Sequence, residues 1–413
     1  MVKGFGEAFV SRKKSSQSSP LKPAIDGEQL QQQLAEHFEN LEDPRGSQGV
    51  LHPFISIVTI ALLATIGGAQ GWEDIEIYGV SHEEWLSSFL NLPFGIPSAD
   101  TYRRLFERIS PQALEKSFKA WLSSLVIDLG AEVIPIDGKT LKGSYDRNSS
   151  QSALHSVSAW ASEHRLFLGQ VKVKSKSNEI TAIPALLELL DISRSIITID
   201  AMGTQHKIAH RIVTLGADYV LALKANHPTL HTQVQQWFEN AQRHNFESIE
   251  YSYDVRVESG HHRREKRQVW AVAISQMGDL YQQTQWSGLQ TIVMVIRTRH
   301  LWNKTTREIM FYLSSLPPDA QQLGRAIRQH WSIENQLHWI LDVTFGEDTC
   351  RIRTGNAPEN MALLKRWSIN LLNRETSFKK STRQKARRVS MDKGYLLKVL
   401  AASIPLQSNL SDA

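Results

Sequence analysis

The sequence predicts an α/β protein in which a helical region precedes a domain built around a mixed β-sheet. Up to about residue 129, apolar residues recur with the period of a helix, and Gly- and Pro-containing breakers separate the segments. From residue 133 onward, short apolar runs alternate with amphipathic helical segments, which is the pattern of βαβ units. The 413 residues, 41% of them hydrophobic and 22% charged, suffice for a large core and for two or three domains.

The composition excludes several classes of protein. The longest apolar run, residues 54–68, is shorter than the roughly 20 residues that span a bilayer, so we expect no membrane partner. The single cysteine, Cys350, excludes an internal disulfide framework and a cysteine-based zinc site, and it predicts a cytoplasmic protein. The net charge of +5 and the pI near 9.1 permit a polyanionic partner without requiring one.

The first part of the chain is expected to be a tail followed by an all-helical domain. Residues 1–22 are rich in serine and lysine and lack the apolar segment of a signal peptide, so they are predicted to be disordered. Residues 23–129 are predicted to fold as helices over 28–41, 53–68, 73–91, 99–109 and 111–129. The fourth helix carries Arg103 and Arg104, which either contact DNA phosphates or are simply solvated.

The next segment, residues 130–225, predicts the core of the sheet. Strands are expected at 133–137, 154–161, 166–174, 195–200 and 218–223, with helices at 178–190 and 205–215. The order β, β, β, α, β, α, β is ribonuclease-H-like and lacks only a last helix. Residues 319–373 are expected to complete this domain with helices at 320–342 and 360–373.

A β-rich insertion and a basic tail account for the rest. Residues 226–318 predict a helix at 228–243 and then strands at 250–258, 268–274, 291–298 and 308–313, which we expect to protrude from the sheet. His261 and His262 lie in a charged loop and are expected to be exposed. Residues 374–413 predict a basic C-terminal tail, in which Lys379–Arg388 form either a solvated face or a contact with phosphates.

The helix predicted at 320–342 contains an unusual acidic residue. Leu323, Ile327, Leu337 and Leu341 fall on one stripe with the spacing of a face that packs into a core, and Glu334 falls on the same stripe. A carboxylate that points inward is costly unless hydrogen-bond donors or a cation compensate it. The helix alone leaves these two compensations open, and the rest of the chain favours a metal ion.

Two further carboxylates occupy matching positions. Asp137 and Asp200 each end an apolar strand, and on neighbouring strands they would stand side by side and repel each other without a cation. With Glu334 as a third ligand, the set suits Mg²⁺ or Mn²⁺, and we expect two ions. Such ions activate an attacking oxygen and stabilise a leaving one, so the predicted chemistry is cleavage or transfer of phosphodiesters.

Other motifs are weaker. The sequence has no phosphate-binding P-loop, no nucleophile elbow and no His-Glu-x-x-His zinc motif. Asp342, Glu347 and Asp348 form a second acidic cluster that binds metal, caps a helix end, or pairs with Arg351 and Arg353. Three lysines beside the strand ends have either a phosphate-binding or a structural role: Lys139, Lys142 and Lys224.

Five long motifs resemble the ISAs1-family insertion-sequence transposases, the group that includes the H-repeat-associated proteins. They cover residues 136–143, 176–184, 198–203, 217–224 and 330–343, and the resemblance extends from about residue 43 to residue 373. It implies a DDE transposase of the IS4-like superfamily with Asp137, Asp200 and Glu334 as its triad. It also implies that the N-terminal helical region is the transposase-associated, DNA-binding domain.

The chain departs from the wider superfamily around its glutamate. Where the superfamily carries Tyr, Arg and Lys, this sequence has Ile327, His330 and Leu341. Phosphate contacts that the superfamily makes with those residues would come from Arg325, Arg328 or His330.

The expected function is therefore metal-dependent cleavage at the ends of the chain's own element, followed by joining of the 3′ hydroxyl to target DNA. We expect a homodimer when assembled on DNA, associated with the nucleoid when bound. Two alternatives remain open from the sequence. One is a catalytically silent or domesticated DNA-binding protein of the same fold, and the other is a ribonuclease-H-like endonuclease without strand transfer.

Overall fold

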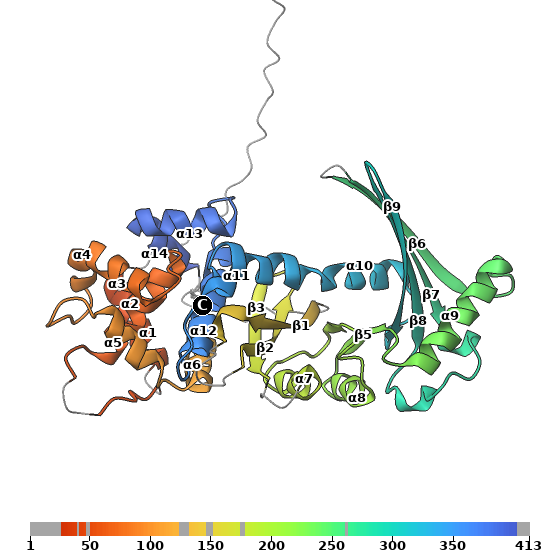
Figure 1. Ribbon diagram of the computed structural model, residues 1–413, viewed down its shortest axis with the longest axis horizontal. Helices are drawn as coiled ribbons and strands as arrows, with labels where there is room; N and C mark the ends of the chain where they lie inside the picture. The colour runs from red at the N-terminus through yellow and green to blue at the C-terminus, as the bar shows by residue number, and fades with distance from the viewer. Residues whose placement is uncertain are drawn as a thin grey trace, which may run out of the picture.

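The computed structural model describes residues 26–38, 41–46, 50–123, 132–145, 152–173, 178–260 and 263–402. The expectations for the tail 1–22, for His261 and His262, and for residues 403–413 lie outside these residues. The described chain is elongated, with the helical region at one end, the sheet in the middle and a curved β-extension at the other end (Figure 1). None of its helices combines the length and the apolar character needed to cross a membrane.

One nine-stranded sheet runs through the molecule in the order β3-β2-β1-β4-β5-β9-β8-β7-β6. The neighbours β1, β4 and β5 are parallel and every other pair is antiparallel. The strands are β1 (Val133–Leu141), β2 (Leu154–Ala161), β3 (Leu166–Lys172), β4 (Ile196–Ile199), β5 (Asp218–Leu223), β6 (Tyr251–Gly260), β7 (Arg263–Ala273), β8 (Thr291–Leu301) and β9 (Thr305–Ser314). The first five strands confirm the predicted ribonuclease-H-like order.

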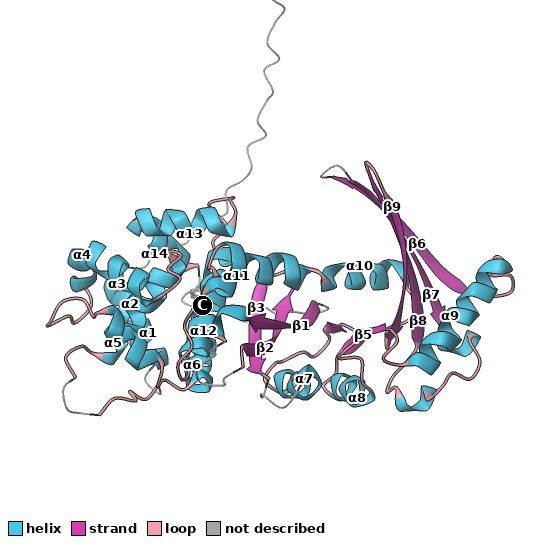
Figure 2. Ribbon diagram, in the orientation of Figure 1, coloured by secondary structure: helices cyan, strands magenta, loops and turns pink. Residues whose placement is uncertain are grey.

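Helices cover both faces of this sheet (Figure 2). On one face lie α7 (Glu179–Glu188), α8 (His206–Thr214) and α9 (Pro228–Arg243), which share an apolar core with the sheet. On the other face lies α10 (Ala320–His330), which packs on β1, β4 and β5 and continues over β6 to β8. The predicted α/β fold with helices on both faces is confirmed.

The insertion does not form a separate sheet. Its last strand, β9, pairs with β5 through Val220–Leu223, and β8, β7 and β6 follow outward. This pairing satisfies the edge of β5, which would otherwise carry unpaired backbone groups. The strands β6 to β9 therefore extend the central sheet and curve away from it as they rise past α10 (Figure 1).

The N-terminal region is helical as predicted, but its core is shared. Its helices are α1 (Gly27–Phe38), α2 (Phe54–Ile66), α3 (Trp72–Ser81), α4 (Glu83–Ser87), α5 (Ala99–Phe106) and α6 (Pro111–Ser123). They pack against α12 (Ala357–Arg374), and one continuous apolar cluster joins α2 to α12 and to the C-terminal helices. The helical region is thus anchored on the domain that carries Glu334.

The predicted basic tail is wrong for residues 374–402. This stretch forms α13 (Thr382–Met391) and α14 (Lys393–Ala401), which pack on each other and on α12. The amphipathic spacing of Ala386 and Val389 buries one face. Lys385 is buried, and its ammonium donates to the backbone carbonyls of Leu372 and Glu375. Its charge therefore serves the fold and does not belong to a solvated run.

Candidate active site

Asp137 lies on the face of the sheet that α10 covers. Side chains alternate along a strand, and in β1 Ile134 and Ile136 enter the core beneath α7 and α8, while Val133 packs toward α10. Asp137 shares the face of Val133, and it follows the fully buried part of the strand. The carboxylate thus sits where β1 emerges from the core.

Asp200 directly follows β4, the parallel neighbour of β1. The register pairs Ile136 with Ile199, so Asp137 and Asp200 occupy corresponding positions on adjacent strands, as predicted. Thr198, two residues earlier on the same face, contacts α10 through His330. The Asp200 carboxylate accepts hydrogen bonds from the backbone N–H groups of Met202 and Gly203, at 3.0 and 3.4 Å.

Glu334 does not lie on an inward stripe, and this prediction is corrected. The helix after α10 contains a π-helical turn, Glu334–His338, in which Trp339 donates its backbone N–H to the carbonyl of Glu334 five residues back. The extra residue in this turn rotates the buried stripe onto Ile333, Leu337 and Leu341. Glu334 is consequently exposed at the edge of the sheet. The chain returns to α-helix in α11 (Trp339–Val343).

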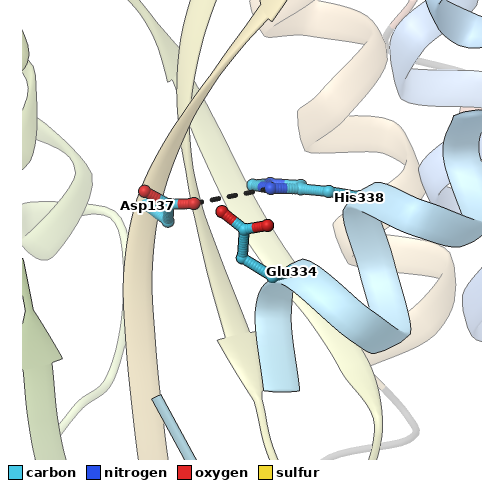
Figure 3. Close-up of side chains that lie close together, drawn as sticks. All are labelled: Asp137, Glu334 and His338. Atoms are coloured by element: carbon cyan, nitrogen blue, oxygen red, sulfur yellow. Dashed lines mark ion pairs between the residues drawn. The ribbon is translucent and has the colours of Figure 1, made fainter. Parts of the chain in front are cut away.

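Glu334 meets Asp137 there, together with a histidine that the prediction did not include. Ligand atoms of Asp137, Glu334 and His338 all lie within 4.8 Å of one another. Figure 3 shows the two carboxylates and the imidazole converging from β1 and from the π-helical turn. Within the described residues Asp200 does not belong to this cluster. The structure thus brings two of the three predicted acids into direct proximity and keeps the third on the adjacent strand.

The electrostatics of the cluster favour a bound cation. Burial raises the pKa of Asp137 to about 7, and the nearby Glu334, Glu179 and Asp200 carboxylates add to this shift. Burial also lowers the pKa of His338 to about 3, with Arg366 and Lys139 contributing. The imidazole is therefore neutral at physiological pH, and Asp137 carries an ionisation penalty that a divalent cation would remove.

Replacing Asp137 with Asn is expected to stabilise the metal-free protein above pH 7. The folded protein keeps a proton on Asp137 that the unfolded chain loses near pH 3.8, so stability falls as pH rises from about 4 to 7. The whole penalty is on the order of 4 kcal/mol. Thermal melting in EDTA should give a higher Tm for Asp137→Asn at pH 8 and little difference at pH 4.

The exposed Asp279 provides the control for this measurement, because Asp279→Asn should leave the melting profile unchanged. Added Mn²⁺ should raise the Tm of the wild type and not that of Asp137→Asn, since a ligand that binds only the folded state stabilises it. An Asp137→Asn protein that melts below the wild type at pH 8 would contradict the ionisation penalty.

Lys139 and Lys142 each pair with carboxylates of the protein. Lys139 donates to both carboxylate oxygens of Asp342 at 2.8 Å, and its side chain is only 10% exposed. Lys142 pairs with Asp348 at 2.7 Å, and Lys139 approaches the same carboxylate at 3.4 Å. These lysine–aspartate pairs connect the chain just after Asp137 to the segment that follows His338. Both lysines thus have a structural role, and their contact with phosphate stays a prediction, since the Lys142 side chain is 77% exposed.

The second acidic cluster, Asp342, Glu347 and Asp348, pairs with basic residues other than the predicted Arg351 and Arg353. Asp342 and Asp348 hold the two lysines, and Glu347 pairs with Arg366 at 2.5 Å with both side chains buried. Arg353 donates instead to the backbone carbonyl of Gly143.

The other residues predicted to contact phosphates near the cluster differ in exposure: His330 is partly buried, whereas Lys224 and Arg328 are exposed. His330 is partly buried and its Nδ1 lies 3.0 Å from the Thr198 hydroxyl, while desolvation lowers its pKa. A neutral, hydrogen-bonded imidazole is poorly suited to hold a phosphate. Lys224, in contrast, is exposed just after β5, at the same edge as Asp137 and Asp200. Arg328 is also exposed, 3.6 Å from Glu258.

Arg103 and Arg104 lie on α5, and both pair with Asp100. Arg103 also bonds Glu107 at 2.9 Å and lines a cleft of about 550 Å³ between the helical region and residues 346–357. Arg351 and Arg353 line the same cleft. Arg103 thus faces a polar groove and Arg104 is exposed, and acids on their own helix partly balance both charges.

A stronger basic feature lies on the β-extension. The register aligns Arg256, Arg267 and Arg297 across β6, β7 and β8, and directly opposite residues share a face. This is the face of Val269 and Val295, which pack toward α10 with Val133. The arginine row and the acids Asp137 and Asp200 therefore lie on the same face of one sheet.

Part of this face forms a pocket of about 190 Å³ that we term the arginine pocket. Its basic lining residues are Arg263, Arg267, Arg297, Arg299 and Arg328, and Glu265 is the acid among the lining residues. Glu265 bonds both Arg267 and Arg299, which fixes their guanidinium groups. Trp331 and Asn335 close the pocket on the side of Glu334, and Trp331 is 44% exposed.

A ribonuclease-H-like sheet with one acid within β1 and another directly after the adjacent β4 defines a class of enzymes that cut or join nucleic-acid phosphodiesters. Residues 128–371 match the family described as "Transposase DDE domain", and residues 35–122 match the family described as "DDE_Tnp_1-associated". The chain therefore belongs to the DDE transposase family and is a DNA transposase.

Relatives agree with this assignment along nearly the whole chain. The sequence is 38% identical over 375 residues to "H repeat-associated putative transposase YhhI" of Escherichia coli (strain K12), which covers 90% of this chain and 98% of the relative. It is 37% identical over 375 residues to "Putative transposase YncI" of Escherichia coli O157:H7, covering 90% of this chain and 95% of the relative.

Proposed function

We propose that the chain cleaves DNA at the ends of its own element and joins the freed 3′ hydroxyl to target DNA. Asp137, Asp200 and Glu334 would hold Mg²⁺ or Mn²⁺, as two ions. The observation that carries this proposal is the position of the acids and the arginine pocket on one face of the sheet. The scissile phosphate and its neighbouring phosphates would then be held by one continuous surface, formed by the acids and the arginine pocket.

The residues present fit a divalent metal. Asp137 and Glu334 offer hard oxygen ligands within 4.8 Å of each other, and Asp200 stands on the adjacent strand. When bound, such ions supply a Lewis acid and an activated oxygen nucleophile for an in-line displacement. Burial raises the pKa of Asp137 to about 7 and the nearby carboxylates add to the shift, so a bound cation would offset the cost of ionising this carboxyl group.

The protein's own contribution is positioning. The Lys139–Asp342 pair holds β1 against the helix that bears Glu334, so the two carboxylates keep their separation. Lys224 lies at the same sheet edge and would contact a phosphate beside the scissile one. The Asp200 carboxylate is oriented by two backbone N–H groups. Such preorganisation lowers the barrier because the reacting groups need not be ordered during reaction.

DNA is the proposed partner, and two surfaces would hold it. The arginine pocket would hold phosphates on one side of the acids, and the cleft lined by Arg103, Arg351 and Arg353 would hold them on the other. Arg104 would contribute from the exposed side of α5, and Arg328 from the pocket's rim. We propose that two copies assemble on DNA, one at each end of the element.

Reversing charges in the arginine pocket is expected to weaken DNA binding at least tenfold. In the double variant Arg263→Glu/Arg328→Glu, two contacts with phosphates would be lost and replaced by repulsion. The slope of log K against log salt should become shallower by about 2. Fluorescence anisotropy with a labelled duplex over a salt series measures both quantities.

Arg243 offers the matched control, because it is exposed on α9 on the opposite face of the sheet. Arg243→Glu changes the net charge by half as much as the double variant does, yet it should leave the affinity nearly unchanged. If the control lost about half as much binding free energy as the double variant, overall charge, and not the pocket, would govern binding.

The proposed reaction is tested by strand transfer. The DNA that flanks the gene is first searched for inverted repeats, and a duplex of one repeat, with its 3′ hydroxyl exposed at the element boundary, is then tested with a supercoiled plasmid as target. Joined products in Mg²⁺ support the proposal, and short target duplications at the junctions would identify integration. Specific cleavage of the ends without any joined product would favour an endonuclease, and binding without either would favour a silent DNA-binding protein.

A further inference from the structure

His338 is a histidine of the acidic cluster that the proposed triad does not use. Its side chain is 7% exposed, and its Nδ1 lies 3.5 Å from Oδ2 of Asp137. Its Nε2 is buried without a hydrogen-bond partner in the described part of the chain. A neutral imidazole bears one N–H, so one of its nitrogens carries a lone pair that the protein leaves unused.

The geometry suits coordination of a cation by this imidazole. Two ligand atoms that each lie about 2.0–2.2 Å from one ion are separated by roughly 3 Å when they are adjacent in its coordination shell. The 3.5 Å between Nδ1 and the Asp137 oxygen is close to this value. Glu334 lies within the same 4.8 Å range and approaches from the first residue of the same π-helical turn.

The π-helical turn explains how both side chains reach Asp137. Glu334 and His338 are four residues apart and lie on one side of the turn, as Figure 3 shows. His338 is buried beside Leu337, whereas Glu334 stands at the exposed edge. One cation between them and Asp137 would thus have a protected nitrogen ligand on one side and a solvent-facing oxygen ligand on the other.

We infer that His338 coordinates the cation held by Asp137 and Glu334, which makes this a mixed nitrogen–oxygen site. The inference rests on the proposed function and deepens it, because it assigns a ligand beyond the three acids. The imidazole enters as its neutral form. An imidazole binds a metal ion through a nitrogen that carries no proton.

A nitrogen ligand changes which metal the site prefers. Mg²⁺ is held by oxygen ligands, whereas imidazole suits transition metals better, and Mn²⁺ accepts both kinds of ligand. The site should therefore bind Mn²⁺ more tightly than Mg²⁺, and part of this preference should depend on His338. Its loss should weaken Mn²⁺ binding by about tenfold or more and affect Mg²⁺ binding less.

Pulsed electron paramagnetic resonance of the full chain with Mn²⁺ tests the inference without any activity measurement. The wild type should show the ¹⁴N modulation of a directly coordinated imidazole, and His338→Gln should lose it. His330→Gln is the matched control, since His330 lies on the preceding helix and is hydrogen-bonded to Thr198. It should retain the modulation. Calorimetric titration with Mn²⁺ and with Mg²⁺ gives the two affinities for each variant.

The outcomes separate the inference from the function on which it rests. Bound Mn²⁺ without ¹⁴N modulation in the wild type, or modulation that persists in His338→Gln, would overturn the role of His338 and leave the acidic site intact. Failure of Mn²⁺ to bind the wild type at all, with DNA present or absent, would overturn both. Circular dichroism of His338→Gln, and of a second variant, His338→Leu, ensures that a lost signal comes from a folded chain.

Discussion

Replacing Glu334 with Gln is expected to lower DNA cleavage by about a thousandfold or more, a loss of about 4 kcal/mol of transition-state stabilisation. The amide keeps the shape of the side chain but removes the charge that would hold the cation beside Asp137. Because Glu334 is exposed at the edge of the sheet, the fold does not depend on it. A nicking assay on a duplex that contains the element's end measures the effect.

Asn335 supplies the control for this variant. It is the exposed neighbour of Glu334 on the same turn, and Asn335→Gln alters the local surface without removing a charge. It should lower cleavage far less than Glu334→Gln. The affinity of Glu334→Gln for the duplex should match the wild type, because the arginine pocket is intact. Nicking at the wild-type rate by Glu334→Gln would transfer the role of third ligand to another acid.

Replacing Arg366 with Met is expected to destabilise the fold by about 3–5 kcal/mol. Arg366 and Glu347 form an ion pair in which the side chains are 0% and 1% exposed, and removal of the arginine leaves a buried carboxylate uncompensated. Glu347 directly precedes Asp348, which pairs with Lys142 and approaches Lys139. Loss of the pair should thus also loosen the connection that positions Asp137. Chemical denaturation measures the change in free energy of unfolding.

A double variant distinguishes loss of the pair from loss of packing. Glu347→Leu/Arg366→Met removes both charges and should recover much of the lost stability, because well-packed apolar residues can replace a buried ion pair. The exposed arginine Arg104, paired with Asp100, gives the comparison. Arg104→Met should cost less than about 1 kcal/mol. A similar cost for both single variants would contradict the importance of burial at Arg366.

Periodicity predicted most of the fold because the buried faces are regular. The strands that lead to Asp137 and Asp200 were predicted from short apolar runs, and they are neighbours in the sheet, although β1 continues past Asp137 to Leu141. The pairing of β9 with β5 was not predictable in the same way, because residues 224–304 separate the partners and no local pattern specifies a distant edge. The basic tail failed because charge density concealed the spacing of Ala386 and Val389.

The sequence predicted the acids of the candidate site but not the π-helical turn, His338 or the arginine pocket around them. A regular helix would place Glu334 on the buried stripe, and the π-helical turn, which the apolar spacing does not encode, shifts it to the edge. His338 stood four residues after Glu334, a spacing that would have indicated a shared helix face. The arginines of the arginine pocket also alternate along β7 and β8 in the sequence. Only the pairing register of the two strands shows that these arginines lie beside one another.

The most direct test of the central claim is cleavage of a duplex that carries the element's end by the wild-type chain, with Mg²⁺ or Mn²⁺ and with EDTA. The proposal predicts nicks at the element boundary that leave a 3′ hydroxyl, formed with either metal and eliminated by EDTA. Each of Asp137→Asn, Asp200→Asn and Glu334→Gln should eliminate the same nicks while binding the duplex. Nicking that persists in EDTA, or that all three variants retain, would contradict a metal-dependent site at these carboxylates.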